Sequence, residues 1–416
     1  MPLERFEQSL RSPSKKRDAD EPPPRASRVE ITWSVPAIEG VPPCARGGHS
    51  TVLADTHLLV FGGHYFGGAG AFAYLNDLHR LDLTTSTWYE IVFREQDAVR
   101  PKPRYNHSAL LLNGGTRMFV FGGRGETLRQ AQVLRDMFFF DLLAMEWLQV
   151  QWTTESPAAR FGHSCASVDD VRMVLFGGWD GKKSMNDLWV FDSNTFTWLK
   201  PRCSGKAPAP RQNHSMLPVG SFGPEGQTPS SSSSTSSSAA ATTLIVYGGY
   251  SVLPDALPVY NKDVYLFDVE SLAWSRPRLV GEYPPGTFGQ GMCVHASEMA
   301  FVLGGWSGTE RSPLYMGDKQ VREFASMAAR EERLASGQES RGGKKAQTRQ
   351  LKTASAYARV LDLPSMTWFR PAAHGVAVAN RYGHSCTLVG PHVFLFGGWD
   401  GNRALSQLVV GELTIG

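Results

Sequence analysis

Val60-Phe61-Gly62-Gly63 is the stretch that decides the fold, because it ends an apolar run on two adjacent glycines and then recurs along the chain. The further copies are Val120-Phe121-Gly122-Gly123, Leu175-Phe176-Gly177-Gly178, Val246-Tyr247-Gly248-Gly249, Val302-Leu303-Gly304-Gly305 and Leu395-Phe396-Gly397-Gly398. Self-similarity at intervals of about 50 residues or more is the signature of a repeat architecture. The intervals that follow the third and fifth copies are the longest, which indicates insertions there.

Three further elements recur in register with the glycine pairs. An Arg-x-x-His-Ser element lies upstream, a strand ending in aspartate lies downstream, and a tryptophan follows that strand. In the fifth repeat, Thr287, Gln290 and Gly291 stand where the arginine, histidine and serine are expected. The arginines are Arg46, Arg104, Arg160, Arg211 and Arg381, and the tryptophans are Trp88, Trp147, Trp198, Trp274 and Trp368.

This combination, repeated six times over about Val29 to Leu413, resembles the kelch-repeat β-propeller family. The resemblance implies an all-β, six-bladed propeller. Elementary physics agrees with it, since four short apolar strands separated by turns form an antiparallel blade. One such blade cannot bury both of its faces, and stacking blades around an axis buries them. Paired glycines permit positive φ and close backbone approach, and each tryptophan can fill the space between neighbouring blades.

The two ends of the chain predict how the ring closes. No tryptophan strand follows Leu408-Val409-Val410, whereas Val29-Glu30-Ile31-Thr32-Trp33 supplies one at the other end. We therefore expect the N-terminal strand to complete the last blade, which removes a free sheet edge. The expected organisation is a disordered tail over residues 1–27 and a propeller over residues 28–416.

The propeller should have two distinct faces. We call upper the face that carries the Arg-x-x-His loops and the loops after the glycine pairs. The serine-rich stretch 221–243 falls on the lower face and is expected to be a disordered spacer. The insertion 307–352 falls in blade five on the upper face, and the spacing of Val321, Phe324 and Ala328 predicts a helix over Asp318 to Leu334. This helix either packs on the rim or forms a lid or partner-binding element.

Composition excludes several classes of protein. The net charge of +3 is too small to argue for nucleic acid. The five cysteines form no Cys-x-x-Cys pair, so neither a zinc site nor a disulfide framework is indicated. No apolar window is long enough to span a membrane, and no secretory leader is evident. We expect a cytoplasmic protein, a monomer within a larger complex, with nuclear, cytoskeletal or ciliary association as alternatives.

The arginines of the repeat are the first candidate site. One interpretation places Arg46, Arg104, Arg160, Arg211 and Arg381 around the upper mouth, where a cationic ring would bind the carboxylates of an acidic or C-terminal peptide. The resemblance implies the same, since arginines at this position line the peptide pocket in kelch substrate receptors. The alternative is that each arginine pairs with an aspartate or carbonyl of its own blade.

Residues beside these motifs form the second candidate set. Large side chains follow the glycine pairs or the arginines, and Trp, Tyr and Arg dominate binding hot spots. The alternative is that they cover the tops of neighbouring blades. The set comprises Arg124, Tyr105, Phe161, Trp179, Tyr250, Trp306, Tyr382 and Trp399.

The chemistry of the repeat favours binding over catalysis. Symmetry keeps His49, His107, His163, His214 and His384 apart, so we expect hydrogen-bonding groups within each blade and no metal ring. No hydrolase, phosphate-binding or metalloprotease motif occurs, so we expect no enzyme and no cofactor. The sequence predicts a protein-interaction module, scaffold or adaptor that binds a peptide or partner loop on the upper face. The alternatives are a substrate receptor of a ubiquitin ligase and a metal-dependent kelch oxidase or lyase.

Overall fold

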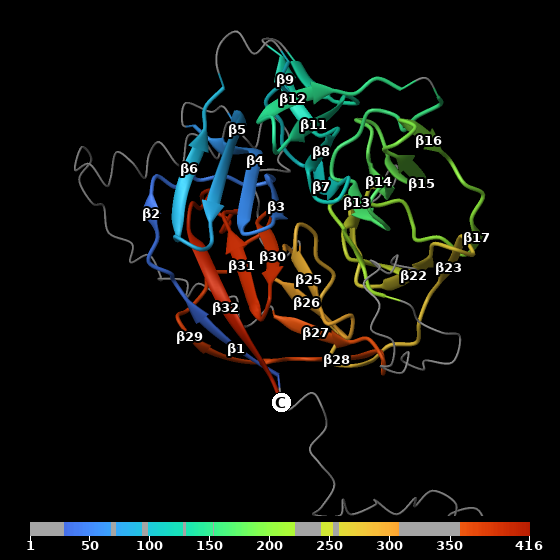
Figure 1. Ribbon diagram of the computed structural model, residues 1–416. Coiled ribbons are helices and arrows are strands. Elements are labelled where there is room, and N and C mark those ends of the chain that lie inside the picture. Colours follow the sequence, from blue (N-terminus) through green and yellow to red (C-terminus); the bar gives the residue numbers. More distant parts are fainter. Residues whose placement is uncertain are drawn as a thin grey trace, which may run out of the picture.

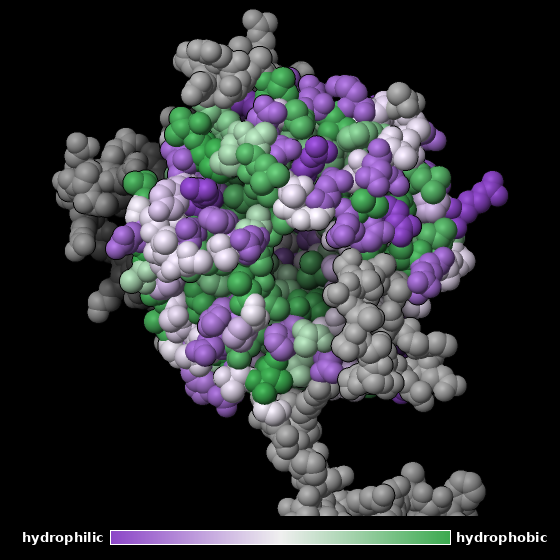
Figure 2. Space-filling view, in the orientation of Figure 1, coloured by the Kyte–Doolittle hydropathy of each residue, from purple (hydrophilic) through white to green (hydrophobic). Residues whose placement is uncertain are grey.

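The computed structural model describes residues 29–67, 72–93, 99–127, 130–152, 154–220, 243–252, 258–307 and 358–416. In these ranges every regular element is a strand, and six sheets surround a central axis (Figure 1). The face drawn in Figure 2 is hollowed at its centre. The predicted helix over Asp318 to Leu334, like nearly all of the serine-rich stretch, lies outside the described residues.

Each blade is built from four antiparallel strands, ordered from the axis outward. The first three blades are β3 (Ser50–Ala54), β4 (His57–Phe66), β5 (Phe72–Asp82) and β6 (Thr87–Ile91); β7 (Ser108–Leu112), β8 (Arg117–Phe121), β11 (Met137–Asp141) and β12 (Glu146–Gln149); and β13 (Ser164–Ser167), β14 (Arg172–Trp179), β15 (Ser184–Asp192) and β16 (Thr197–Leu199). Blades four and five are β18 (Ser215–Pro218), β19 (Thr243–Tyr247), β22 (Val264–Asp268) and β23 (Ala273–Ser275), then β25 (Gly291–His295), β26 (Met299–Leu303), β27 (Arg359–Asp362) and β28 (Thr367–Phe369).

The last blade unites the two ends of the chain. It contains β30 (Ser385–Val389), β31 (His392–Phe396), β32 (Leu408–Ile415) and then β1 (Val29–Ser34). Strand β1 pairs antiparallel with β32, with Val29 opposite Ile415 and Ser34 opposite Val410. This confirms that the N-terminal strand closes a six-bladed ring.

Four blades carry a fifth, outermost strand, which was not expected from the sequence. The connection arriving from the preceding blade pairs in parallel with the outer strand, at β2 (Glu39–Gly40), β17 (Ser204–Gly205), β24 (Val280–Gly281) and β29 (Ala372–Gly375). Each of these strands includes a glycine with positive φ. A Cβ on Gly375 would lie 2.1 Å from the carbonyl oxygen of Trp33, so only glycine fits there. Blade three has Thr154 at the corresponding position, and its hydroxyl accepts a hydrogen bond from the Trp198 N–H instead.

The apolar core lies between blades. Six clusters of buried side chains each join two neighbouring sheets. Five outer tryptophans pack on the aromatic residue before the preceding blade's glycine pair; the Trp147 ring centroid, for example, lies 4.9 Å from that of Phe61. Burial of this kind cannot occur within one sheet, so each blade depends on its neighbours.

The glycine pairs are the points where consecutive blades contact each other through their backbones. A Cβ on Gly62, whose φ is 64°, would lie 2.8 Å from the carbonyl oxygen of Arg104 in the next blade. The N–H of Gly63 donates to that same oxygen at 2.8 Å, and the equivalent bond occurs at all six joints. The paired glycines therefore let consecutive blades approach through their backbones.

A closed circle of backbone hydrogen bonds surrounds the axis; we call it the axial ring. Its members are the third residues of the Arg-x-x-His elements, and all six have φ between 50° and 65°. Each donates its N–H to the carbonyl of the equivalent residue in the preceding blade, at 2.6–3.0 Å. Only glycine and asparagine occur at these positions, as left-handed backbone favours. The six members are Gly48, Asn106, Gly162, Asn213, Gly289 and Gly383.

A short hairpin extends blades two and four on the upper side. In blade two β9 (Arg124–Thr127) pairs with β10 (Gln130–Val133), and in blade four β20 (Tyr250–Ser251) pairs with β21 (Val259–Tyr260). Both hairpins begin at the residue that follows a glycine pair. They raise the wall around the upper mouth.

Candidate protein-binding site

Six two-residue bridges form what we call the upper rim. In each blade the residue after the arginine position exchanges two backbone hydrogen bonds with the residue after the glycine pair. This local pairing places two residues of each blade at the mouth of the ring. The pairs are Gly47–His64, Tyr105–Arg124, Phe161–Trp179, Gln212–Tyr250, Phe288–Trp306 and Tyr382–Trp399.

The upper rim encloses a cavity of about 360 Å³ whose floor is the axial ring. Every rim residue except Gly47 and Trp306 lines it, and Val252 and Pro258 complete the wall. Most of the rim side chains are buried; Trp399, for example, is only 1% exposed. Arg124 and Trp179 are the two rim residues that are half-buried and open to a ligand.

Arg124 is the single charged residue of the cavity lining. Its guanidinium carbon lies 5.7 Å from the ring centroid of Phe161, and the guanidinium also interacts with the Tyr105 hydroxyl. Among the residues that the structure describes, no carboxylate lies within ion-pair distance of it. A cation held over an aromatic face without a counter-ion is suited to receive an anionic group.

Two buried acceptors also line the cavity. The Nδ1 of His64 lies 2.9 Å from the Gly47 carbonyl oxygen, so Nδ1 carries the hydrogen and Nε2 is left as an acceptor. Burial lowers the pKa of His64 to about 3, so the imidazole is neutral. Within the described part of the chain neither His64 Nε2 nor the Gln212 side-chain oxygen has a protein partner.

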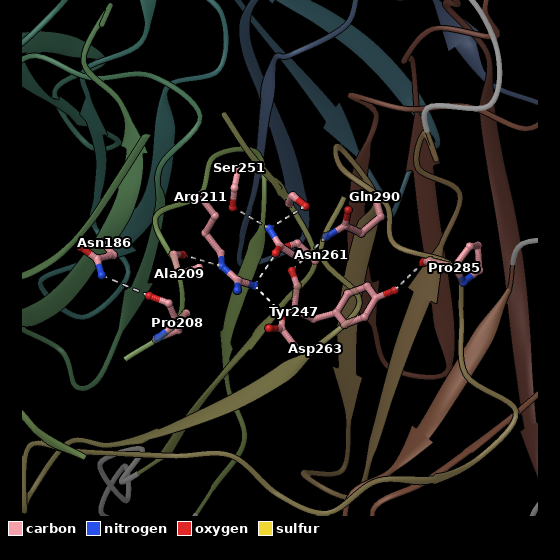
Figure 3. Close-up of polar contacts among 12 residues, drawn as sticks. Asn186, Pro208, Ala209, Arg211, Tyr247, Ser251, Asn261, Asp263, Pro285 and Gln290 are labelled. Carbon is pink, nitrogen blue, oxygen red and sulfur yellow. Dashed lines mark hydrogen bonds and ion pairs between the residues drawn. The ribbon is translucent and has the colours of Figure 1, made fainter. Parts of the chain in front are cut away.

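The five motif arginines lie elsewhere, inside the blades. All are 0–1% exposed. Arg46 forms two 2.7 Å hydrogen bonds to the two carboxylate oxygens of Asp77, and its Nη1 also donates to the Gly62 carbonyl at 3.0 Å. Arg104 and Arg160 repeat this arrangement with Asp136 and Asp187. Arg211 bonds to Asp263 through Nη1 alone, at 2.9 Å, and the same nitrogen donates to the Gly248 carbonyl. Figure 3 shows Arg211 directed at Asp263 and at the Ala209 carbonyl.

The cationic ring proposed from the sequence is therefore not formed, and the alternative of pairing within each blade is the observed one. The physical reason is that a guanidinium at the end of the inner strand can satisfy a carboxylate and two carbonyls at once. Arg381 differs, because Gln407 stands in place of the aspartate and accepts a hydrogen bond at 3.0 Å. Burial lowers the pKa of Arg381 to about 10, although the nearby Asp400 opposes the shift.

The remaining predicted residues do meet at the upper rim. Tyr105, Phe161, Tyr250 and Tyr382 are neighbours in the lining, whereas Trp306 packs behind it, with its ring centroid 5.2 Å from that of Tyr382. Sequence reasoning did not select Gln212 or Asn106. Gln212 could have been found from its alignment with Tyr105 and Phe161, one residue after the arginine.

Two of the repeat histidines, His49 and His107, hydrogen-bond to the preceding blade, in contrast to the expected role within each blade. The Nε2 of His107 lies 2.8 Å from the Ser50 hydroxyl of the preceding blade, and that of His49 lies 3.1 Å from Ser385 Oγ across the closing joint. The rings line a cavity of about 140 Å³ along the axis. Among the described residues, no group of three or more His, Cys, Asp or Glu side chains could hold a metal ion. The described part of the chain also includes no helix able to cross a membrane.

Comparison with known proteins agrees with this architecture. A model of the KLHDC2/KLHL20/DRC7 Kelch-repeats domain matches residues 93–223. Kelch domain-containing protein 3 of Rattus norvegicus is 33% identical over 195 residues, which cover 45% of this chain and 49% of that protein, so the match spans about half of the relative. The flagellar outer arm dynein alpha chain of Chlamydomonas reinhardtii is 28% identical over 400 residues, 91% of this chain but 7% of that protein.

Host cell factor of Drosophila melanogaster is also similar, at 28% identity over 209 residues, 46% of this chain and 14% of that protein. The matched regions make up very different shares of the three relatives, from 49% to 7%. Residues 93–223 thus match a kelch-repeat domain, and the six repeats in register and the six-bladed ring give the described chain the architecture of a kelch-type β-propeller.

Proposed function

We propose that this propeller is a protein-interaction module whose upper cavity binds a peptide or a loop of a partner protein through an acidic or carboxylate group. The observation that carries the proposal is the position of Arg124, a half-buried cation without a carboxylate partner in the described lining. Its neighbour on the rim of the next blade, Trp179, is the other accessible side chain. The kelch family and the relatives above support an interaction module in general.

The chemistry of the lining supports a peptide ligand. Eight of the twelve rim residues are aromatic, and aromatic side chains with arginine supply most of the energy at protein interfaces. The planar fork of an arginine binds a carboxylate with two hydrogen bonds. Recruitment to a ubiquitin ligase, the alternative above, would place a substrate peptide in the same cavity.

A peptide selection on the full-length protein tests this proposal. The probe is a random peptide pool, screened once with free C-terminal carboxylates and once amidated, and binding of selected peptides is followed by tryptophan fluorescence. Arg124→Ala should lower the affinity for the selected peptides by about tenfold or more, as expected for loss of a charged hydrogen bond worth about 1.5–3 kcal/mol. Arg124→Lys should rescue only part of the affinity, because lysine lacks the fork.

Arg172→Ala is the matched control, since Arg172 is an exposed arginine that pairs with Asp169 at the end of β14 away from the rim. It should leave peptide affinity unchanged. Selection of peptides that carry no acidic group, or binding that Arg124→Ala does not affect, would exclude the proposed role of the cavity.

A further inference from the structure

A short basic motif, separate from the upper cavity, is repeated on the outer side of three successive blades. Two residues after the outer tryptophan, blades three, four and five carry a cation followed by proline, at Lys200-Pro201, Arg276-Pro277 and Arg370-Pro371. Arg202 and Arg278 follow two residues later in the first two connections, and Lys206 follows the fifth strand of blade four. All six basic side chains are exposed.

The fifth strands link these cations into one surface, which we call the basic wall. Strand β17 pairs with β23 so that Gly205 lies opposite Trp274, which places Lys206 beside the residue preceding Arg276. Strand β24 carries the chain from Arg278 onto blade five, where Gly281 lies opposite Trp368, two residues before Arg370. Figure 1 shows β16, β17, β23 and β28 following one another along the outside of the ring.

The charges of the basic wall are not neutralised within the described structure. None of its six cations has a carboxylate within ion-pair distance in the described ranges. Lys200 lies 5.4 Å from the ring centroid of Trp189, and the Arg276 guanidinium lies 5.7 Å from that of Tyr265. Glu282 is the one acidic residue in the three connections 199–206, 275–283 and 369–376. Aromatic faces thus lie beside the charged ends of two cations, and both side chains remain exposed to a partner.

The fold itself does not require these cations. The equivalent connection of blade six, residues 33–40, contains no lysine or arginine, yet it leads into the fifth strand β2 in the same way. Residues 147–154 of blade two also lack basic residues. The connections that leave blades three, four and five are therefore basic, whereas the equivalent connections of blades two and six are not.

We propose that the basic wall binds an extended acidic segment, rich in Asp and Glu, of a partner protein. Its cations are spread along three blades of a curved outer surface, so a flexible chain can contact all of them in turn. A flat lipid surface would contact only some of these cations at once. The three connections expose one aromatic side chain, Tyr283, which gives little platform for stacking nucleic-acid bases. Charge complementarity of this kind accelerates association and orients the partner.

The test titrates a labelled poly-glutamate peptide against the full-length protein by fluorescence anisotropy. A quadruple reversal, Lys200→Glu, Arg202→Glu, Arg276→Glu and Arg278→Glu, should weaken binding by about tenfold or more, since fields of this kind change association by about 10–10³. Binding should also weaken between ionic strengths of about 0.1 M and about 1 M, where the Debye length falls from about 10 Å to about 3 Å.

The control reverses four exposed cations elsewhere, Lys182→Glu, Lys183→Glu, Arg172→Glu and Arg403→Glu, and so changes the net charge equally. It should leave affinity within about threefold, since distant exposed charges are screened. Equal losses in both quadruple variants, or no binding of poly-glutamate at low salt, would overturn the proposal. So would tighter binding of phosphatidylserine vesicles or duplex DNA through the same residues. Poly-glutamate can also reach Arg124 in the upper cavity, so the titrations are repeated in the Arg124→Ala background, where the quadruple reversal should still weaken binding by about tenfold or more.

Discussion

The backbone N–H of Gly398 in the last blade donates a 2.8 Å hydrogen bond to the carbonyl oxygen of Arg46 in the first. The equivalent hydrogen bond joins each of the five remaining pairs of neighbouring blades, as between Gly63 and Arg104. The closing joint is thus chemically equivalent to the internal ones at the axis. What distinguishes the last blade is its outer part, where β1 supplies the strand that the C-terminal end lacks.

Stability should therefore depend strongly on the N-terminal strand. Trp33 is 3% exposed in the cluster between blades five and six. Trp33→Ala should lower the free energy of unfolding by about 3–5 kcal/mol, because it leaves a cavity in a packed core. Urea denaturation followed by circular dichroism measures the loss. Glu30→Ala, an exposed substitution in the same strand, should change it by less than about 0.5 kcal/mol.

The motif arginines should matter for folding, in contrast to Arg124. Arg104→Ala leaves Asp136 and the Gly122 carbonyl without their buried partner, so we expect a loss of about 3 kcal/mol. Arg172→Ala removes an ion pair whose arginine side chain is 48% exposed, and it should cost at most about 1 kcal/mol. Thermal melts of the two variants provide the comparison. Equal stability of both would show that the buried pairs contribute little.

The glycines of the fifth strands should be intolerant of a side chain. Gly375→Ala combines a φ of 82° with a Cβ 2.1 Å from the Trp33 carbonyl oxygen. Gly390→Ala has a comparable φ of 56° but meets nothing within 4 Å. The second variant should cost about 1–2 kcal/mol from backbone strain alone. The first should cost clearly more, and chemical denaturation of both variants separates strain from collision.

Acidification should destabilise the propeller through its buried histidines. Burial lowers the pKa values of His107, His214 and His384 to about 3, as it does for His64. In the unfolded chain these groups bind protons near pH 6.5, so below that pH the unfolded state holds more protons than the native one. Stability should fall as the pH drops from about 6.5 towards 3, by up to about 1.4 kcal/mol per pH unit for each histidine.

A single substitution isolates one of these groups. Glutamine occupies the histidine position in blade five, where Gln290 donates a 3.2 Å hydrogen bond to Ser215 of the preceding blade. His107→Gln should therefore fold. Between about pH 4 and 6 its free energy of unfolding should change less steeply with pH, by the contribution of one proton, which is about 1.4 kcal/mol per pH unit. Urea unfolding over a pH series measures the slope. An unchanged slope would mean that His107 does not titrate as proposed.

The residues at the upper mouth mark the limit of sequence reasoning. Arg104 and Arg124 have the same chemistry and adjoin the two inner strands of one blade, but one is enclosed in the blade and the other opens into the cavity. A signal for the difference was present, since Asp77 and Asp187 both follow an asparagine at the same place in their repeats. It was insufficient, because a motif does not tell which side chains point at one another.

The sequence by itself determined the number of blades, their order and the strand that closes the ring. These follow from counting repeats and from the covalent order of the chain, which require no distances. Only the tertiary structure decided which arginines are buried, which cation remains unpaired and how cations from three connections form one wall. These properties depend on the direction of side chains and on contacts between residues dozens of positions apart, and such contacts exist only once the blades have packed around their axis.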